Sequence, residues 1–362
     1  MKAAVMRAVG EPLSIEDVEL APPDDDEVLI RVAASGLCHS DLHFVEGWYP
    51  IKLPAVLGHE AAGVVEAVGE NVTYVAPGDH VITYLTTSCG ECAYCVEGRT
   101  HLCEDRGFAQ RDRDEPARIT QDGVALTQFL NLGSFAGGML VHQGAVVKIT
   151  REIPLDKAAL LGCGVTTGLG AVFNTAGVSK GQTVAVLGCG GVGLASVQGA
   201  AIAGASKVIA VDLVDEKLNL ARLLGATDTI NGSTDDPVSR VLEMTDGRGV
   251  HHALEANGAK TTVEMAFKML RRGGVATVIG LLPEGAVVEI SGDQLYYEKA
   301  IQGSNMGSSN FRRDIPGYID WYLEGRLNLD DMVTRRLSLD SINEGFDDMR
   351  KGLSARSILV FD

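Results

Sequence analysis

The 362-residue chain is predicted to be an α/β protein, with a β-rich domain followed by a doubly wound parallel sheet. Short β-branched runs separated by Gly, Pro and Asp fill the first 160 residues, whereas strands and helices alternate after about residue 165. A chain of this length exceeds the size at which a single core usually stops growing. Two domains are therefore expected.

The β-rich domain is expected to span residues 1–164. Its clearest strands are predicted where β-branched residues are bounded by turn residues, at 28–33, 63–68 and 80–84. Near the end of the chain, helical patterns at 314–324 and 341–351 lead to a last strand at 357–361. Residues 306–362 are therefore expected to return to the first domain.

The second domain is expected to span residues 165–305. Its predicted strands are 183–188, 207–212, 229–230, 249–255 and 275–280, and its predicted helices are 192–203, 215–224 and 260–270. About six parallel strands would complete a doubly wound sheet. His251 and His252 are expected to be strand residues without a functional role.

Composition excludes several classes of protein. The formal net charge of −17 disfavours nucleic acid as a partner, because phosphate binding requires clustered Lys and Arg. The uncharged stretches at 158–179 and 181–206 are rich in Gly and small polar residues, so we interpret them as buried structure and expect no membrane span. The N-terminus has no leader pattern, and seven cysteines in such a chain favour metal binding, so the cytoplasm is the expected location.

A glycine-rich turn between a predicted strand and helix indicates a dinucleotide site in a Rossmann-type domain; its residues are Gly188, Gly190, Gly191, Val192 and Gly193. Asp212, at the end of the next strand, suits the ribose hydroxyls and would repel a 2′-phosphate, so NAD is predicted rather than NADP. Lys217 is also within reach of the ribose. The alternative is a turn without a ligand, in which Asp212 caps the next helix.

Four cysteines lie close together in sequence and indicate a structural zinc site: Cys89, Cys92, Cys95 and Cys103. Disulfides and a small nucleic-acid-binding zinc ribbon are the alternatives. Nearby acidic residues count against the ribbon: Glu91, Glu97, Glu104 and Asp105.

Cys38, His59 and Cys163 are candidate ligands of a second zinc, although by spacing alone each is as readily a packed residue. The pattern GHE-x2-G-x5-G-x2-V from Gly58 to Val72, the cysteine-rich loop and GCGGVG together resemble the zinc-dependent medium-chain alcohol dehydrogenases. The resemblance covers the whole chain. It implies a GroES-like catalytic domain beside the Rossmann domain.

The resemblance implies that the three candidates hold a catalytic zinc and that the four clustered cysteines hold a structural zinc. It also implies that Asp41 orients the ligand His59, that Glu60 assists ligand exchange behind the metal, and that Arg356 lies near the cofactor pyrophosphate. A helix cap for Asp41 and exposed surface charges for the other two are the alternatives.

The implied mechanism oxidises an alcohol. Zinc lowers the pKa of the alcohol, Ser40 accepts its proton, and His43 passes that proton to solvent, while hydride moves to NAD. His43 as an ordinary surface histidine is the alternative. His39 is expected against the pyrophosphate and Thr167 against the nicotinamide, and the expected pocket lining, with core packing as its alternative, is Tyr49, Leu85, Phe108, Phe129, Leu130 and Leu281.

The sequence therefore predicts an NAD-dependent zinc enzyme that interconverts primary alcohols, aromatic or of medium length, and aldehydes. A glutathione-dependent formaldehyde dehydrogenase and a non-catalytic zinc- and nucleotide-binding protein are the alternatives. The resemblance implies a homodimer or homotetramer joined through edge strands of the cofactor domains. The charged loop at 104–123 is expected either near the pocket mouth or at a subunit contact.

Overall fold

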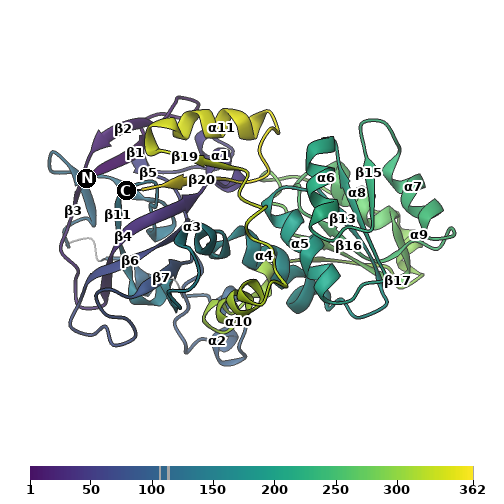
Figure 1. Ribbon diagram of the computed structural model, residues 1–362, viewed down its shortest axis with the longest axis horizontal. Helices are drawn as coiled ribbons and strands as arrows, with labels where there is room; N and C mark the ends of the chain where they lie inside the picture. The colour runs from purple at the N-terminus through teal and green to yellow at the C-terminus, as the bar shows by residue number, and fades with distance from the viewer. Residues whose placement is uncertain (106, 112–114, 362) are drawn as a thin grey trace. The chain divides into compact units, whose positions relative to one another are not determined.

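The computed structural model describes residues 1–105, 107–111 and 115–361. The chain divides into two compact units (Figure 1). The first contains Met1–Cys163, Asn310–Glu324 and Val333–Asp362, and the second contains Gly164–Ser309 and Gly325–Met332. The domain boundaries expected from the sequence, at 164/165 and 305/306, stay a prediction.

The first unit is built from antiparallel and mixed sheets. Its largest sheet has the order β12-β7-β6-β4-β20-β19, with β11 also pairing with β4. The strands of this sheet are β4 (Glu27–Gly36), β6 (Glu60–Val68), β7 (His80–Thr83), β11 (Gly138–His142), β12 (Val146–Ile149), β19 (Arg335–Leu337) and β20 (Ser357–Val360). β20 pairs antiparallel with β4, so the end of the chain completes the sheet that its beginning starts.

Two smaller sheets flank this one in the first unit. The order β10-β5-β1-β2 joins β10 (Thr127–Gln128), β5 (Ala55–Val56), β1 (Lys2–Met6) and β2 (Ser14–Asp17). The order β3-β8-β9 joins β3 (Glu19–Leu20), β8 (Ile119–Gln121) and β9 (Val124–Ala125). The helices of this unit are α1 (His39–Val45), α2 (Ala93–Val96), α3 (Leu155–Ala158), α10 (Phe311–Leu323) and α11 (Ile342–Arg350).

A buried cluster ties the termini of the first unit together. Leu42 and Val45 of α1 pack with Ile342 and Phe346 of α11, and Leu37 at the end of β4 is fully buried among them. This burial fixes the position of α1, the helix that carries several of the predicted site residues.

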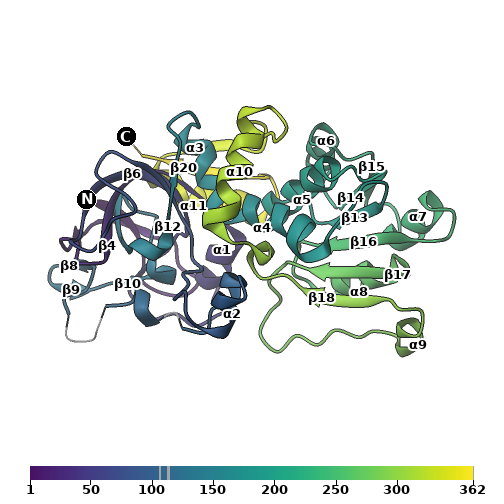
Figure 2. The ribbon, with the colours of Figure 1, turned by 90° about the horizontal axis from the view of Figure 1, so that it is seen from below.

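The second unit contains a parallel sheet with the order β15-β14-β13-β16-β17-β18. Its strands are β13 (Thr183–Leu187), β14 (Lys207–Asp212), β15 (Asp228–Asn231), β16 (Val250–Glu255), β17 (Leu270–Val278) and β18 (Ala300–Gly303), and Figure 2 shows β18 beside β17 at one edge. Its helices are α4 (Gly164–Gly170), α5 (Gly191–Ile202), α6 (Asp215–Leu223), α7 (Pro237–Met244), α8 (Lys260–Lys268) and α9 (Gly292–Leu295). The strand order reverses between β13 and β16, as in a doubly wound sheet.

The predicted fold class is confirmed. In the second unit the sequence analysis missed the helices α4, α7 and α9 and the edge strand β18; of these, α7 begins with Pro237 after the capping residue Asp236. β17 also begins five residues earlier than predicted. Its first five residues, 270–274, include two arginines and two glycines, which do not give the apolar pattern expected of a strand. Among the described residues no single helix has the length and apolar character to cross a membrane, although the bent pair Leu155–Gly162 and Gly164–Ala176 passes that test together.

Candidate active site and metal centres

The cysteine-rich loop forms a compact cluster of four sulfurs. The Sγ atom of Cys103 lies 3.6 Å from that of Cys89 and 4.0 Å from that of Cys92, and the Sγ atoms of Cys89 and Cys95 are 3.9 Å apart. Four sulfurs bound to one zinc at about 2.3 Å stand about 3.8 Å apart, whereas a disulfide needs about 2.05 Å. The loop therefore fits a tetrahedral metal, and all seven cysteines are free thiols.

The three candidate ligands of the second zinc converge, although they come from distant parts of the chain. Cys38 precedes α1, His59 precedes β6, and Cys163 ends the segment after α3. Their donor atoms and one carboxylate oxygen of Glu60 all lie within 4.8 Å of one another, and all four residues are buried. Zinc binds such donors at about 2.0–2.3 Å, so one ion fits among them.

The two thiols of this cluster shift each other's pKa in opposite directions. A hydrogen bond from Cys163 lowers the pKa of Cys38 well below its ordinary value, and the same bond, together with burial, raises the pKa of Cys163. A thiolate is the form of cysteine that binds metal. Cys38 is therefore prepared for metal binding by its neighbour.

Asp41 fixes the orientation of His59. Its Oδ1 atom lies 3.0 Å from Nδ1 of His59 and also accepts the backbone N–H of Gly58 at 3.1 Å. The imidazole Nε2 atom is buried and has no hydrogen-bond partner among the described residues, which suits a metal-binding nitrogen. Burial alone would lower the pKa of His59, but Asp41 and the sulfur of Cys38 outweigh it and raise that pKa.

The carboxyl of Asp41 also closes the first turn of α1. Its Oδ2 atom accepts the backbone N–H of Cys38 at 3.3 Å, as the second half of a capping box. The cap and the histidine contact, which the sequence analysis treated as alternatives, are therefore both present. One buried carboxylate positions two of the three candidate ligands.

Glu60 and Arg356 form a buried ion pair behind the candidate ligands. Nη2 of Arg356 donates to Oε1 of Glu60, and Nη1 donates to the backbone oxygen of Leu37 at 3.1 Å. Burial raises the pKa of Glu60, and the guanidinium of Arg356 limits that rise. The surface-charge alternative is wrong for both residues, which are 0% and 6% exposed. A contact between Arg356 and the cofactor pyrophosphate stays a prediction.

The predicted proton-relay residues lie on α1. The Oγ atom of Ser40 is 3.7 Å from the sulfur of Cys38, beside the candidate metal. His43, one helical turn further on, is half-buried and stacks on Trp48 with ring centroids 4.2 Å apart and planes 6° apart. Burial lowers the pKa of His43, so its imidazole is neutral at pH 7. His39 is exposed at the start of the helix.

Trp48 was missed by sequence reasoning. It is 45% exposed, an unusual position for a tryptophan, and its stacking on His43 holds the imidazole ring in place. The sequence signal was present, since an aromatic residue five positions after a candidate relay histidine can return to it where α1 ends at Val45.

Aromatic rings lie beside the candidate metal ligands. The ring of Phe129 is 5.9 Å from that of His59 and 4.7 Å from that of Phe44, and Tyr49 lies 5.6 Å from Phe44. Of the predicted pocket residues, Phe129 and Tyr49 therefore belong to an aromatic cluster at the metal site. Phe44 was not among the predicted pocket residues.

The other predicted pocket residues lie elsewhere. Leu85 packs against a hydrophobic core cluster, and Phe108 contacts the edge of the His142 ring at 5.1 Å. Leu130 is 40% exposed and has a positive φ of 52°, and Leu281, which belongs to the second unit, is 46% exposed. The pocket role of these four residues stays a prediction.

The glycine-rich turn after β13 has the geometry that a dinucleotide requires. Gly188 has φ of +92°, and a Cβ atom on Gly193 would lie 1.7 Å from the oxygen of Gly188, so only glycine fits there. A Cβ on Gly190 would meet nothing within 4 Å, which leaves open space over the turn. The turn leads into α5, whose first N–H groups lack a side-chain cap and are available to a phosphate.

Asp212 is held against this turn. Its Oδ2 atom accepts the N–H of Cys189 at 2.7 Å. Its Oδ1 atom accepts the N–H of Leu213 at 2.8 Å and that of Val214, the N-cap residue of α6, at 3.1 Å. A contact between Asp212 and the ribose stays a prediction. Lys217 lies in the first turns of α6 and is half-buried. Thr167 is buried on α4, the helix that packs against α5, and its Oγ1 atom is 3.7 Å from the sulfur of Met306.

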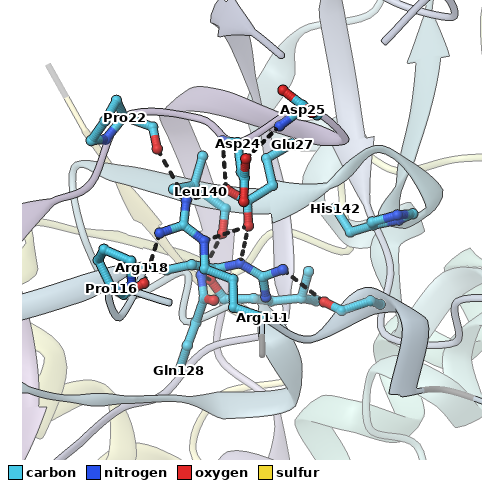
Figure 3. A network of polar contacts seen from close by, with 12 residues as sticks. Pro22, Asp24, Asp25, Glu27, Arg111, Pro116, Arg118, Gln128, Leu140 and His142 are labelled. Carbon is cyan, nitrogen blue, oxygen red and sulfur yellow. Dashed lines mark hydrogen bonds and ion pairs between the residues drawn. The ribbon is translucent and has the colours of Figure 1, made fainter. Parts of the chain in front are cut away.

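Part of the charged loop at 104–123 is anchored to the sheet of the first unit. Residues 106 and 112–114 of that loop lie outside the described residues. Arg111 and Arg118 both bind the buried carboxylate of Glu27 at the start of β4 (Figure 3), and Arg118 donates to Oε1 of Glu27 at 2.6 Å. Burial would raise the pKa of Glu27, but the two guanidinium groups outweigh it and lower that pKa.

Two family models match the chain. A zinc-binding dehydrogenase model matches residues 191–324, and an alcohol dehydrogenase GroES-like domain model matches residues 24–151. The chain is 41% identical over 366 residues to an NDMA-dependent alcohol dehydrogenase of Amycolatopsis methanolica, covering 99% of this chain and 98% of that protein. It is 40% identical over 367 residues to an S-(hydroxymethyl)glutathione dehydrogenase of Escherichia coli, with 99% of each covered.

Solved structures agree with these relatives. The crystal structure of benzyl alcohol dehydrogenase from Acinetobacter calcoaceticus superposes with a TM-score of 0.93 at 34% identity, covering 100% of this chain and 99% of that one. The predictions of an enzyme and of zinc and NAD as its cofactors are confirmed. The candidate zinc ligands form two clusters in the first unit, and the glycine-rich turn lies in the second. The chain belongs to the zinc-dependent medium-chain alcohol dehydrogenase family.

Proposed function

We propose that this protein transfers hydride between a primary alcohol, aromatic or of medium length, and NAD, with the aldehyde as product. The convergence of Cys38, His59 and Cys163 on one point carries the proposal, because three protein ligands leave a fourth position of a zinc ion for substrate. The adjacent aromatic cluster of Phe44, Tyr49 and Phe129 favours an apolar substrate. The relatives named alcohol dehydrogenase and benzyl alcohol dehydrogenase support the same class.

Each residue near the metal has a proposed task. Bound zinc supplies a Lewis acid that lowers the pKa of an alcohol hydroxyl toward neutrality. Ser40, beside Cys38, accepts the proton of that hydroxyl, and the neutral imidazole of His43 receives it next and releases it to solvent. Asp41 holds His59 in the tautomer that presents Nε2 to the metal. The carboxylate of Glu60, paired with Arg356, lies behind the metal position and would assist ligand exchange.

NAD is proposed to bind with its pyrophosphate over the turn from Gly188 to Gly193, at the first N–H groups of α5. Asp212 would meet the ribose hydroxyls, assisted by Lys217, and Thr167 would pack against the nicotinamide. His39 and Arg356 would face the pyrophosphate. The close approach at Gly193 and the open space over Gly190 support this placement of the phosphates.

Cys38→Ser tests the zinc mechanism. We expect zinc to fall from two ions per chain to one, and turnover of benzyl alcohol and hexanol with NAD to fall about a thousandfold, since a Lewis acid contributes several kcal/mol. His80→Gln, a histidine at the start of β7 outside the site, is the control and should keep both ions. Because one relative is named for dependence on NDMA, each assay is run with and without NDMA. Unchanged turnover in Cys38→Ser contradicts the proposal.

A glutathione adduct of formaldehyde is the second candidate substrate, favoured by the relative from Escherichia coli. The two candidates differ in one simple measurement. Oxidation of formaldehyde that requires added glutathione, with little activity on benzyl alcohol, would support the second. Activity on benzyl alcohol or hexanol without glutathione would support the first.

We also propose a homodimer or homotetramer joined through β18. This strand ends the parallel sheet, and apolar side chains near it are exposed: Val287, Leu295, Tyr296 and Ile301. An unpaired edge strand with such neighbours readily adds a second copy of the same strand.

We also propose that the protein is located in the cytoplasm. Its seven cysteines are free thiols, as expected of a protein in a reducing compartment.

A further inference from the structure

A polar cavity lies in the unit that carries the glycine-rich turn. Its volume is about 310 Å³, and it is lined at the amino-terminal ends of the strands by Thr183 of β13, Lys207 of β14, His251 of β16 and Arg271 of β17. The cofactor turn and Asp212 follow the opposite ends of the strands. Strands of five and six residues place the two edges about 17–20 Å apart. The cavity is therefore separate from the proposed NAD site.

Cationic side chains surround this cavity, although the chain carries a net charge of −17. Lys207, Arg248 and Arg271 all line it. Lys207 lies 3.6 Å from Asp228, and Arg248 lies 3.0 Å from Asp246, an exposed carboxylate that also lines the cavity. For Arg271 the described residues offer no carboxylate within ion-pair distance. One guanidinium charge thus faces the cavity without a counterion.

No neutral tautomer of His251 provides every neighbouring hydrogen-bond donor with an acceptor. Its Nδ1 atom accepts the backbone N–H of Thr183 at 3.0 Å, while its Nε2 atom lies 2.7 Å from Nη1 of Arg271. A neutral imidazole that accepts at Nδ1 carries its proton on Nε2, and a guanidinium has only donors. The N–H groups of Nε2 and Nη1 therefore point at each other with no acceptor between them.

The opposite tautomer does not remove this conflict. With the proton on Nδ1, His251 would donate to Oγ1 of Thr183, 2.9 Å away, and accept from Arg271 at Nε2. The backbone N–H of Thr183, which is half-buried at the start of β13, would then face a donor instead of an acceptor. An oxygen that accepts from both Nε2 of His251 and Nη1 of Arg271 satisfies every group.

We propose that this cavity binds a phosphate group, as inorganic phosphate or as a phosphomonoester. Its oxygens would accept from His251 and Arg271, and Lys207 and Arg248 would add favourable positive charge. A phosphate carries close to two negative charges at pH 7 and has several strong acceptor oxygens, which matches donors that lack an acceptor. The cavity is large enough for a small organic group beyond the phosphate.

A purely structural explanation accounts for part of this cluster. The helices α5, α7 and α8 end at this edge of the sheet, and the carbonyl groups at helix C-termini favour nearby cations. Lys207 and Arg248 can serve that role. The explanation leaves the pair of donors at His251 and Arg271 without an acceptor, and this pair is the feature that points to an anion.

Calorimetric titration of the zinc-loaded enzyme in saturating NAD tests the proposal, because bound NAD occupies the other phosphate site. Inorganic phosphate and glycerol phosphate are the probes, and we expect a Kd below about 1 mM for at least one of them. Tighter binding of glycerol phosphate would identify a phosphomonoester as the ligand class, and equal or weaker binding would identify inorganic phosphate.

Variants distinguish a specific phosphate site from nonspecific electrostatic attraction. Arg271→Gln and His251→Asn should each weaken binding about tenfold or more, as expected for a lost charge-assisted hydrogen bond. Arg272→Gln is the matched control, since its guanidinium lies 4.4 Å over the ring of Tyr297 and does not line the cavity. Unchanged NAD affinity verifies that each variant is folded. Equal affinities in all four proteins, or no binding of either probe to the unmodified enzyme, would overturn the proposal.

Discussion

The candidate catalytic centre depends on one residue that does not touch the metal. Asp41 is fully buried, accepts from the backbone N–H groups of Cys38 and Gly58, and binds Nδ1 of His59. A buried carboxylate is unfavourable unless it is fully hydrogen-bonded, and these contacts meet that condition. The same contacts fix the positions of the two candidate ligands Cys38 and His59 without a bound metal.

Asp41→Asn should weaken the catalytic zinc about 10- to 100-fold, because an amide is a poorer partner for the imidazole and reduces its basicity. Competition between the enzyme and a chelator of known zinc affinity measures this change at one of the two sites. Asp340→Asn, at an exposed position, should leave both zinc affinities unchanged. Equal chelator titrations of Asp41→Asn and the unmodified enzyme would show that Asp41 only caps α1.

The four clustered cysteines could be identified from their spacing, whereas Cys38, His59 and Cys163, and the support of His59 by Asp41, were expected only from the family resemblance. The ligands belong to short motifs whose residue types are dictated by the metal. The stacking of Trp48 on His43 and the contact of Phe44 with Phe129 depend instead on the path of the chain after α1, which no local pattern encodes. Residues that act through packing are therefore harder to predict than residues that act through chemistry.

At the scale of elements, local sequence predicts most of the parallel sheet. The segment β13, glycine turn, α5 and β14 has a buried apolar strand, a turn that only glycine allows and a helix in direct succession. β18 was missed because its residues, Ala300–Gly303, include one β-branched side chain and are mostly exposed. α7 had a recognisable start, with Asp236 as cap and Pro237 in the first turn, that sequence reasoning passed over.

The contact of the charged loop with β4 could not be predicted, because Glu27 is more than 80 residues from its arginine partners. Glu27→Gln should lower the free energy of unfolding by about 3–5 kcal/mol at pH 7, since it leaves two guanidinium groups without their shared carboxylate. Urea unfolding followed by tryptophan fluorescence suits this measurement, because both tryptophans, Trp48 and Trp321, lie in the first unit.

The pH dependence of this difference follows from the lowered pKa of Glu27. Its stabilising effect is fully present above the unfolded-state pKa of about 4.3 and is lost as pH falls through the lower native value. The two proteins should therefore become similar in stability once the pH has fallen below the native pKa of Glu27. Glu66→Gln, whose partner Arg31 is 3.6 Å away and half-exposed, should cost no more than about 1 kcal/mol at any pH. A pH-independent difference for Glu27→Gln contradicts this account.

The only regular elements of the cysteine-rich loop, residues 89–103, are the short helix α2 and one turn of 3-10 helix at Thr100–Leu102, so its order should depend on its metal. Cys95→Ser should lower zinc from two ions per chain to one and remove hydrogen-exchange protection from residues 89–103, while β13 to β18 keep theirs. Glu97→Gln, an exposed change in the same loop, should keep both ions and the protection. Mass spectrometry of exchanged peptides measures both outcomes, and retained protection in Cys95→Ser would show that the loop orders itself without zinc.

On the scale of the whole molecule, the two units divide the chemistry between them. Every candidate zinc ligand belongs to the first unit, although Cys163 is its last residue before the chain enters the second, and the glycine-rich turn and Asp212 belong to the second. Each candidate zinc site is therefore assembled by the fold of the first unit. The length of the chain predicted two domains, but nothing in the sequence predicted the cavity at the other edge of the parallel sheet, because its four lining strands meet only after folding.

Assembly is the property of the whole molecule that one substitution tests most directly. If two copies join through β18, a two-fold axis brings Ile301 of one copy near the same strand of the other, so Ile301→Lys places like charges at an apolar contact. Light scattering coupled to size exclusion should then give the mass of a monomer for Ile301→Lys, and twice or four times that mass for the unmodified enzyme. Leu223→Lys, 65% exposed on α6, should keep the assembled mass. If Ile301→Lys also keeps it, β18 is not the contact, and an unmodified enzyme that is already monomeric would exclude the assembly altogether.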